Sequence, residues 1–137
     1  MVNVSSAAQD TVNGRDLEST QALSDMDAYS KSKLAIIMWS RHLARELNGN
    51  PSFIAVNPGS LLGTKMVKEA FGMDGKSVTI GADILQKAAT DKAFANANGC
   101  YFDNDSGSFS DPHPHALNDA ACTELTATVD ALLERIL

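Results

Sequence analysis

The sequence predicts an α/β fold in which helices cover both faces of a parallel sheet. Residues 52–57 contain the run Phe53-Ile54-Ala55-Val56, a continuous apolar pattern that is typical of a strand buried on both sides. One helical pattern precedes this strand at 28–47, and another follows it at 77–97. Because strands and helices alternate along the chain, we expect about three parallel strands with flanking helices.

Length, composition and charge limit the class of protein. The chain has 137 residues, enough for one domain with a modest core. Its net charge of −6 argues against nucleic-acid partners and anionic membranes, because both require a basic surface. No apolar run approaches the roughly 20 residues that span a bilayer, and no secretory signal is visible. We therefore expect a cytoplasmic protein in which Cys100 and Cys122 are reduced.

The first third of the chain is predicted to form a strand, a loop and a long helix. Residues 1–6 are rich in β-branched side chains and predict a short strand, whereas the polar stretch 7–27 predicts a surface loop. The helix at 28–47 would be capped by Asp25 or Asp27 and end at Asn48-Gly49-Asn50-Pro51. Its predicted apolar face comprises Ile36, Leu43 and Leu47, broadened by Ile37, Met38 and Trp39.

Two further helices are predicted after the buried strand. Residues 65–73 indicate a short helix closed by Gly72, and residues 77–97 indicate a longer one on the opposite sheet face from the helix at 28–47. The apolar residues assigned to the inward side of the longer helix are Ile80, Ile84, Leu85, Ala88 and Ala89.

The C-terminal region is predicted to contain a last strand at 99–102, a turn-rich stretch at 103–114 and a helix at 118–137. The apolar stripe of that helix comprises Leu125, Val129, Leu132, Leu133 and Ile136. Asp111, His113 and His115 have the chemistry of metal ligands. The two histidines flank a proline, and no further His or Cys stands at a metal-ligand spacing, so we predict no metal site.

Tyr29 and Lys33 give the main chemical signal. They are four residues apart at the start of the long helix, and residues at this spacing lie on one helix face. A cation within about 4–6 Å of a phenol favours the phenolate, so Lys33 would make Tyr29 a usable general acid or base. The same spacing occurs by chance in ordinary helices, so the signal depends on the motifs around it.

Those motifs resemble the short-chain dehydrogenase/reductase family. The strand-like Val2-Asn3-Val4-Ser5-Ser6 comes first, the Tyr29-x-x-x-Lys33 helix second, and a strand ending in Pro58-Gly59 third. In that family, a strand ends in a catalytic serine, the next helix carries Tyr-x-x-x-Lys, and the following strand ends in Pro-Gly beside the nicotinamide. The separation of Ser6 from Tyr29 is similar to an insertion in retinol-dehydrogenase-like members.

The resemblance implies an NAD(P)-dependent oxidoreductase that interconverts an alcohol and a carbonyl. Tyr29 would exchange a proton with the substrate oxygen, Lys33 would assist Tyr29 and hold the cofactor ribose, and Ser6 would hydrogen-bond the substrate oxygen. Ser6 is preferred to Ser5 because it stands nearer the carboxyl end of the strand. The cofactor contacts implied by the resemblance are Tyr29, Lys33, Pro58, Gly59, Leu61 and Thr64. Residues 65–73 would correspond to a substrate lid.

The resemblance also implies that residues 1–137 form a single partial domain, the C-terminal half of a doubly wound Rossmann-type fold. The sequence has no G-x-G-x-x-G turn, so the N-terminal dinucleotide-binding half is expected to be absent, and the choice between NAD and NADP stays open. The complete enzyme is expected to be a homo-oligomer. One alternative is a catalytically inert fragment or interaction module with an unpaired strand edge. Another is an unrelated α/β binding domain.

Overall fold

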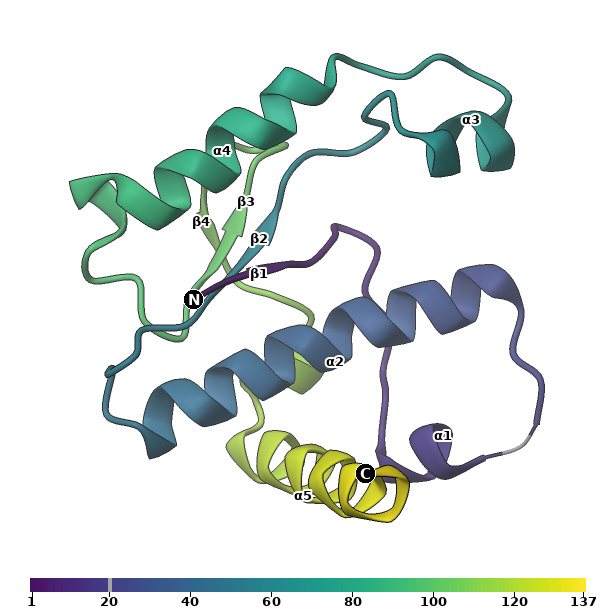
Figure 1. The fold of residues 1–137 in the computed structure, drawn as a ribbon, viewed down its shortest axis with the longest axis vertical. Coiled ribbons are helices and arrows are strands. Elements are labelled where there is room, and N and C mark those ends of the chain that lie inside the picture. Colours follow the sequence, from purple (N-terminus) through teal and green to yellow (C-terminus); the bar gives the residue numbers. More distant parts are fainter. Residues whose placement is uncertain (20) are drawn as a thin grey trace.

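The computed structural model describes residues 1–19 and 21–137 (Figure 1). A single sheet has the strand order β1-β2-β3-β4, in which the first three strands are parallel and β4 is antiparallel to β3. Its strands are β1 (Val2–Val4), β2 (Ile54–Asn57), β3 (Tyr101–Asp103) and β4 (Ser108–Ser110). The predicted α/β class is confirmed, whereas the predicted strand number was too low, because the three-residue β4 is too short to give a strand pattern in the sequence.

Helices cover both sheet faces, as predicted. Helices α2 (Asp25–Glu46) and α5 (Asp119–Ile136) lie on one face, and α4 (Val78–Thr90) lies on the other (Figure 1). The central strand β2 is buried along its whole length and separates two apolar cores. The α2-side core contains Val12, Leu34, Ile37, Met38, Ala55, Tyr101, Ala116, Cys122 and Leu125. The α4-side core contains Ile54, Val56, Ile84, Ala88, Ala97 and Phe102.

The long helix α2 begins a few residues before its predicted start. Ser24 is the N-cap: its hydroxyl accepts a hydrogen bond from the backbone N–H of Asp27 at 3.2 Å and donates one to the Asp27 carboxylate at 2.7 Å. The prediction that Asp25 or Asp27 is the cap was wrong, because both residues lie inside the first turn of the helix. In that turn their negative charges interact favourably with the helix dipole. The helix stops as predicted before Asn48 and Gly49, which both have positive φ.

The inward face of α2 also differs from the predicted one. Leu34, Ile37 and Met38 are fully buried, whereas Leu47 lies beyond the helix and is exposed. Trp39 is half-buried and packs edge-on against the ring of Phe53, with centroids 5.9 Å apart. Leu34 lies outside the predicted face, which begins at Ile36.

The segment 7–27 is more structured than the predicted loop. It contains α1 (Gly14–Glu18), which is capped by the side chain of Asn13. Val12, just before this helix, is 1% exposed and belongs to the α2-side core. One apolar residue in a polar run gives no periodic signal, so the sequence pattern did not reveal this anchor. Thr20 lies outside the described residues.

Helix α4 ends at Thr90, well before the predicted end at Ala97. The side chain of Asp91 accepts a hydrogen bond from the backbone N–H of Ala93 at 2.8 Å and so caps a separate 3₁₀ turn, η1 (Lys92–Phe94). The inward stripe of α4 is Gly81, Ile84 and Ala88. Ile80 and Ala89, which were predicted to face inward, are exposed because this stripe is rotated away from them.

Strand β4 lies inside the predicted turn-rich stretch 103–114. Gly107, with φ of 70°, closes the turn that returns the chain along β3, so that Phe109 is paired with Phe102. Phe94 joins them, and the three rings pack with centroids 5.1 to 5.3 Å apart. A three-residue strand is too short to show a strand pattern, and packing of the aromatic rings specifies it.

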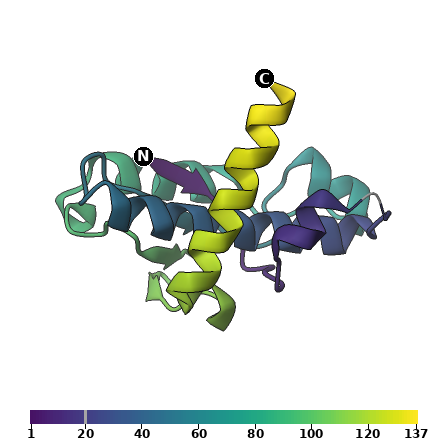
Figure 2. The same cartoon turned by 90° about the horizontal axis from the view of Figure 1, so that it is seen from below.

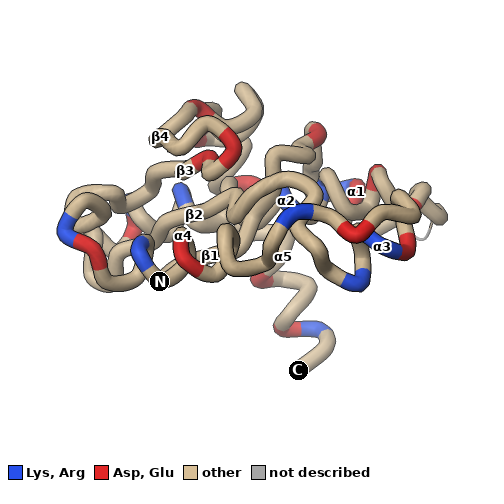
Figure 3. The backbone as a smooth tube through the Cα atoms, turned by 90° about the horizontal axis from the view of Figure 1, so that it is seen from above, with Lys and Arg blue, Asp and Glu red and all other residues tan. Residues whose placement is uncertain are grey.

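Helix α5 follows its N-cap Asn118, and a 3₁₀ turn, η2 (Pro114–Leu117), precedes it. Only part of the predicted apolar stripe is buried. Leu125 is buried, but Leu133 and Ile136 are exposed because the last turns project away from the rest of the protein (Figures 2 and 3). In the described part of the chain, no helix is both long and apolar enough to cross a membrane.

We expect Val12→Ala to destabilise the protein by about 2 kcal/mol, because a fully buried valine loses its packing between α2 and α5. Urea denaturation followed by circular dichroism measures this change. Leu23→Ala is the matched control, since Leu23 lies in the same segment but is exposed. Equal stability of the two variants would show that the segment is not anchored through Val12.

Candidate functional site

The candidate site lies where the carboxyl ends of β1 and β2 approach the N-terminal half of α2. These parts lie on the same side of the protein in Figure 1, because α2 runs back along the sheet after β1. The chain leaves β1 through Ser5 and Ser6 and leaves β2 through Pro58 and Gly59. Open α/β sheets bind ligands at this edge.

Tyr29 and Lys33 lie together at the end of β1. The ammonium of Lys33 is over the ring of Tyr29, 5.5 Å from its centroid. The same ammonium donates a hydrogen bond to the backbone carbonyl of Val4 at 3.2 Å. Both side chains are half-buried. The helix therefore presents a phenol and a cation side by side at the strand end from which Ser6 emerges.

Ser5 and Ser6 differ in what their hydroxyls do. Ser5 is 3% exposed, and its Oγ donates a hydrogen bond to the backbone carbonyl of Lys33 at 2.9 Å. Ser6 is half-buried, and its Oγ accepts a hydrogen bond from the backbone N–H of Ala8 at 3.1 Å. Since Ser6 acts there as an acceptor, its own proton is available to a ligand. Ser5 joins β1 to α2 instead.

Two residues that sequence reasoning missed hold the backbone of Ser6. The Ser6 carbonyl accepts hydrogen bonds from Gln9 Nε2 at 2.9 Å and from the hydroxyl of Tyr101 at 3.2 Å. Burial, assisted by the charge of Asp103, raises the pKa of Tyr101 to about 12, so its hydroxyl stays protonated and able to donate at neutral pH. The available sequence signal was a tyrosine in a buried strand, because such a hydroxyl requires a partner.

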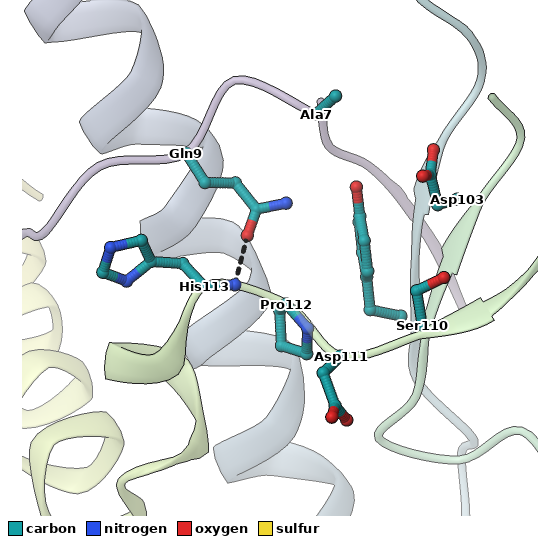
Figure 4. A pocket seen from close by; sticks show the side chains of 8 residues that line it. Ala7, Gln9, Asp103, Ser110, Asp111, Pro112 and His113 are labelled. Carbon is teal, nitrogen blue, oxygen red and sulfur yellow. Dashed lines mark hydrogen bonds between the residues drawn. The ribbon is translucent and has the colours of Figure 1, made fainter. Parts of the chain in front are cut away.

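A cavity of about 340 Å³ opens beside this hydrogen-bonded turn (Figure 4). Gln9 reaches across it, and its Oε1 accepts a hydrogen bond from the backbone N–H of His113 at 2.8 Å. The ring of His113 points away from Asp103 and Ser110 in Figure 4. The cavity is lined by Ala7, Gln9, Tyr101, Asp103, Ser110, Asp111, Pro112 and His113.

The side chains with metal-ligand chemistry at 111–115 have other contacts or are exposed. His113 Nδ1 accepts a hydrogen bond from the backbone N–H of His115 at 3.2 Å, and His115 Nε2 lies 3.0 Å from the carbonyl oxygen of Val12. Asp111 is exposed. Among the residues described, no group of three or more His, Cys, Asp or Glu side chains could hold a metal ion.

A polar network fixes the loop that follows β2. Asn57 is 1% exposed, and its Nδ2 donates hydrogen bonds to Asp103 at 2.8 Å and Asp105 at 2.9 Å. Asp105 also accepts hydrogen bonds from the backbone N–H of Ser60 at 2.9 Å and from its hydroxyl. Burial favours the neutral acid, but the bonds from Ser60 and Asn57, with the charge of Lys76, hold the pKa of Asp105 below its usual value.

The backbone of this loop takes conformations that are uncommon for ordinary residues. Gly59 has φ of 133° and Leu61 has φ of 54°, so the chain turns sharply as it leaves β2. Helix α4 packs closely on the turn, because a Cβ on Gly81 would lie 2.5 Å from Leu62 and 3.3 Å from Pro58. Close packing against α4 thus holds this turn in place.

Thr64 stands where the chain enters α3 (Lys65–Phe71), and its hydroxyl caps that helix by accepting a hydrogen bond from the backbone N–H of Val67 at 3.4 Å. Gly72 closes α3 in the left-handed conformation, as predicted. The segments before and after this helix approach each other closely, because a Cβ on Gly75 would lie 2.7 Å from the backbone of Gly63. The geometry therefore gives Thr64 a structural role, and its cofactor contact stays a prediction.

No protein-family model matches the chain, and no curated protein does so either. The fold and side-chain geometry define an α/β protein with a polar site at its parallel strand ends. Tyr29, Lys33 and Ser6 come from α2 and the end of β1, while Pro58, Gly59, Leu61 and Thr64 form the loop from the neighbouring strand. Catalytic and cofactor-binding roles for these residues remain predictions.

We expect protein stability to fall as the pH rises from about 10 towards 12, because Tyr101 is protonated in the folded protein but ionised in the unfolded chain over this range. The loss attributable to Tyr101 is at most about 1.4 kcal/mol per pH unit. Urea midpoints measured between pH 9 and roughly pH 11.5 should fall less steeply in Tyr101→Phe than in the parent. Identical pH slopes would contradict the raised pKa.

Proposed function

We propose that this chain carries the catalytic residues of an NAD(P)-dependent oxidoreductase of the short-chain dehydrogenase/reductase type, which interconverts an alcohol and a carbonyl. In this proposal the fold is the C-terminal half of a doubly wound Rossmann-type domain that acts in the cytoplasm. The observation that carries it is the Lys33 ammonium, which lies over the Tyr29 ring at the end of the strand that leads to Ser6.

Tyr29 is the proposed acid and base. Its phenol would donate a proton to a carbonyl oxygen in the reductive direction and accept one from a hydroxyl in the oxidative direction. The ammonium of Lys33 lies 5.5 Å from the ring centroid, so a cation stands beside the phenol that would transfer the proton.

Lys33 has a second proposed task. An ammonium group has three donors, and the hydrogen bond to the carbonyl of Val4 uses one of them. The remaining donors suit the hydroxyls of a cofactor ribose. The hydrogen bond to Val4 would hold the Lys33 amine at the end of β1. In that position the amine would contact the ribose and stay beside the ring of Tyr29.

Ser6 would position the substrate. Its Oγ accepts from Ala8, so the Ser6 proton can be donated to the same substrate oxygen that faces Tyr29. The carbonyl of Ser6 is held by Gln9 and Tyr101, which restrains the backbone that carries this hydroxyl. Two donors aimed at one oxygen would orient the substrate and stabilise negative charge that develops there.

The loop after β2 fits the proposed nicotinamide contact. A bound nicotinamide would supply the hydride donor or acceptor of the reaction. The turn at Gly59 and Leu61 brings main-chain groups to the strand end, and Asp105 holds the adjoining Ser60 in place. Pro58, Gly59, Leu61 and Thr64 are the loop residues proposed to hold the cofactor, with no preference between NAD and NADP.

The substrate is proposed to be a small molecule with an apolar part. Four large apolar side chains around α3 are exposed, although burying them would be favourable. They are Leu61, Met66, Phe71 and Met73. Because α3 begins and ends near the loop that follows β2, this surface is suitably placed to cover a substrate beside Ser6.

A second candidate is an inert fragment or interaction module, and the edge of the sheet favours it. In the described chain β1 pairs only with β2, so its other edge has no partner strand, and Val4 is 46% exposed. Such an edge can add a strand from another chain, including a second copy in a homo-oligomer. A folded chain without turnover in any cofactor and substrate combination would favour this candidate.

Under the proposed function, we expect Tyr29→Phe to lower turnover about 10²- to 10⁴-fold, because the proton-transferring oxygen is removed. The assay follows nicotinamide absorbance with a panel of alcohols and carbonyl compounds, while circular dichroism reports folding. Lys33→Met should also lower turnover, whereas the matched control Lys87→Met should not, since Lys87 is exposed near the C-terminal end of α4 and outside the proposed site. A Tyr29→Phe variant that retains most of its activity would remove Tyr29 from the proposed role.

A further inference from the structure

A second cavity, of about 190 Å³, lies at the amino ends of the strands, the opposite end of the sheet from Ser6. The C-terminal half of α2, the start of α5 and the segment before β3 enclose it. The cavity is lined by Arg41, Ala44, Arg45, Asn98, Gly99 and Asp119. It thus has two guanidinium groups and one carboxylate on its walls, although the whole chain has a net charge of −6.

Arg41 has hydrogen-bonding capacity that the described protein does not satisfy. Its Nη1 donates to the carbonyl of Gly99 at 3.2 Å. Its Nε is buried and has no hydrogen-bond partner among the described residues. A guanidinium keeps its charge and carries five N–H donors, and leaving such a donor unpaired inside a protein is unfavourable. The guanidinium therefore has donor capacity that a negatively charged ligand can use.

The polar neighbours of Arg41 are already engaged with other groups. Arg45 donates to both the carboxylate and the backbone carbonyl of Asp119, so the one carboxylate of the cavity is already engaged by the other arginine. The side-chain amide of Asn98 is both an acceptor and a donor. Its oxygen accepts a hydrogen bond from the backbone N–H of Phe53, and its nitrogen donates one to the backbone carbonyl of Ala44. The charges lining the cavity leave one positive charge uncompensated.

The two guanidiniums also lie close enough to act on a thiol in the core behind the cavity. Burial raises the pKa of the Cys122 thiol, and the charges of Arg45 and Arg41 act in the opposite direction. Cys122 is fully buried and its thiol donates to the carbonyl of Ala116 at 3.3 Å, so it is not itself the ligand-binding group. Its surroundings show that both guanidiniums act on the same small region.

We propose that this cavity binds a phosphate group, either as free inorganic phosphate or as a small phosphate monoester. The planar guanidinium of Arg41 suits a tetrahedral oxyanion, and the oxyanion would compete with Asp119 for Arg45. Arg41 lines the cavity, so its guanidinium is placed to contact a ligand bound there. The ligand would connect α2, α5 and the start of β3, independently of the Tyr29 and Lys33 site.

The test is calorimetric titration of the folded chain with sodium phosphate at constant ionic strength, with thermal unfolding as a second readout. We expect saturable binding and a matching rise in melting temperature. Arg41→Met should weaken binding at least about tenfold, the loss of one charge-assisted contact. Arg135→Met is the matched control, because it removes an equal charge from the exposed end of α5. Glycerol phosphate as a second titrant distinguishes a monoester site from one that takes only the free ion.

Asp119→Asn gives an opposite prediction and guards against a folding defect in Arg41→Met. Removing the carboxylate that occupies Arg45 should strengthen phosphate binding several-fold. Absence of saturable binding to the parent chain would overturn the proposal. Equal affinity in the parent, Arg41→Met and Asp119→Asn would overturn it as well, because binding would then occur elsewhere.

Discussion

The position of the candidate site depends on two hydrogen bonds that join the end of β1 to one residue of α2. The Ser5 hydroxyl donates to the backbone carbonyl of Lys33, and the Lys33 ammonium donates to the backbone carbonyl of Val4. Residue 33 is thus held through both its main chain and its side chain. Because Tyr29 is one helical turn away, the same bonds fix the phenol beside the strand that delivers Ser6.

Polar contacts then connect the loops at the three parallel strand ends. The hydroxyl of Tyr101 on β3 reaches the carbonyl of Ser6 after β1, and the amide of Asn57 at the end of β2 reaches Asp103 on β3. Asp105 extends this network to Ser60 in the loop after β2. The sheet interior is apolar, whereas its carboxyl edge is cross-linked by hydrogen bonds. That division gives a site whose backbone is fixed while half-buried side chains remain able to bind a ligand.

The sequence predicted those features that repeat over many residues. The apolar run of β2 and the long pattern of α2 specify a covered parallel sheet, because burial on both faces leaves a continuous signal. Val12, the pair Phe102 and Phe109, and the contact of Tyr101 with Ser6 could not be predicted in this way. Each depends on a partner distant in the chain, so no local period reveals it. The proximity of Tyr29 and Lys33 followed from helix geometry, but their chemical role does not follow from proximity alone.

The most direct measurement of the central claim is a titration of the chain with NADH and NADPH, following nicotinamide fluorescence, with light scattering to determine the size of the particle. We expect saturable binding of at least one cofactor, weakened in Lys33→Met because the amine proposed to hold the ribose is lost. Absence of saturable binding by a well-folded chain, or equal affinity in the parent and Lys33→Met, would contradict the proposed role of this site.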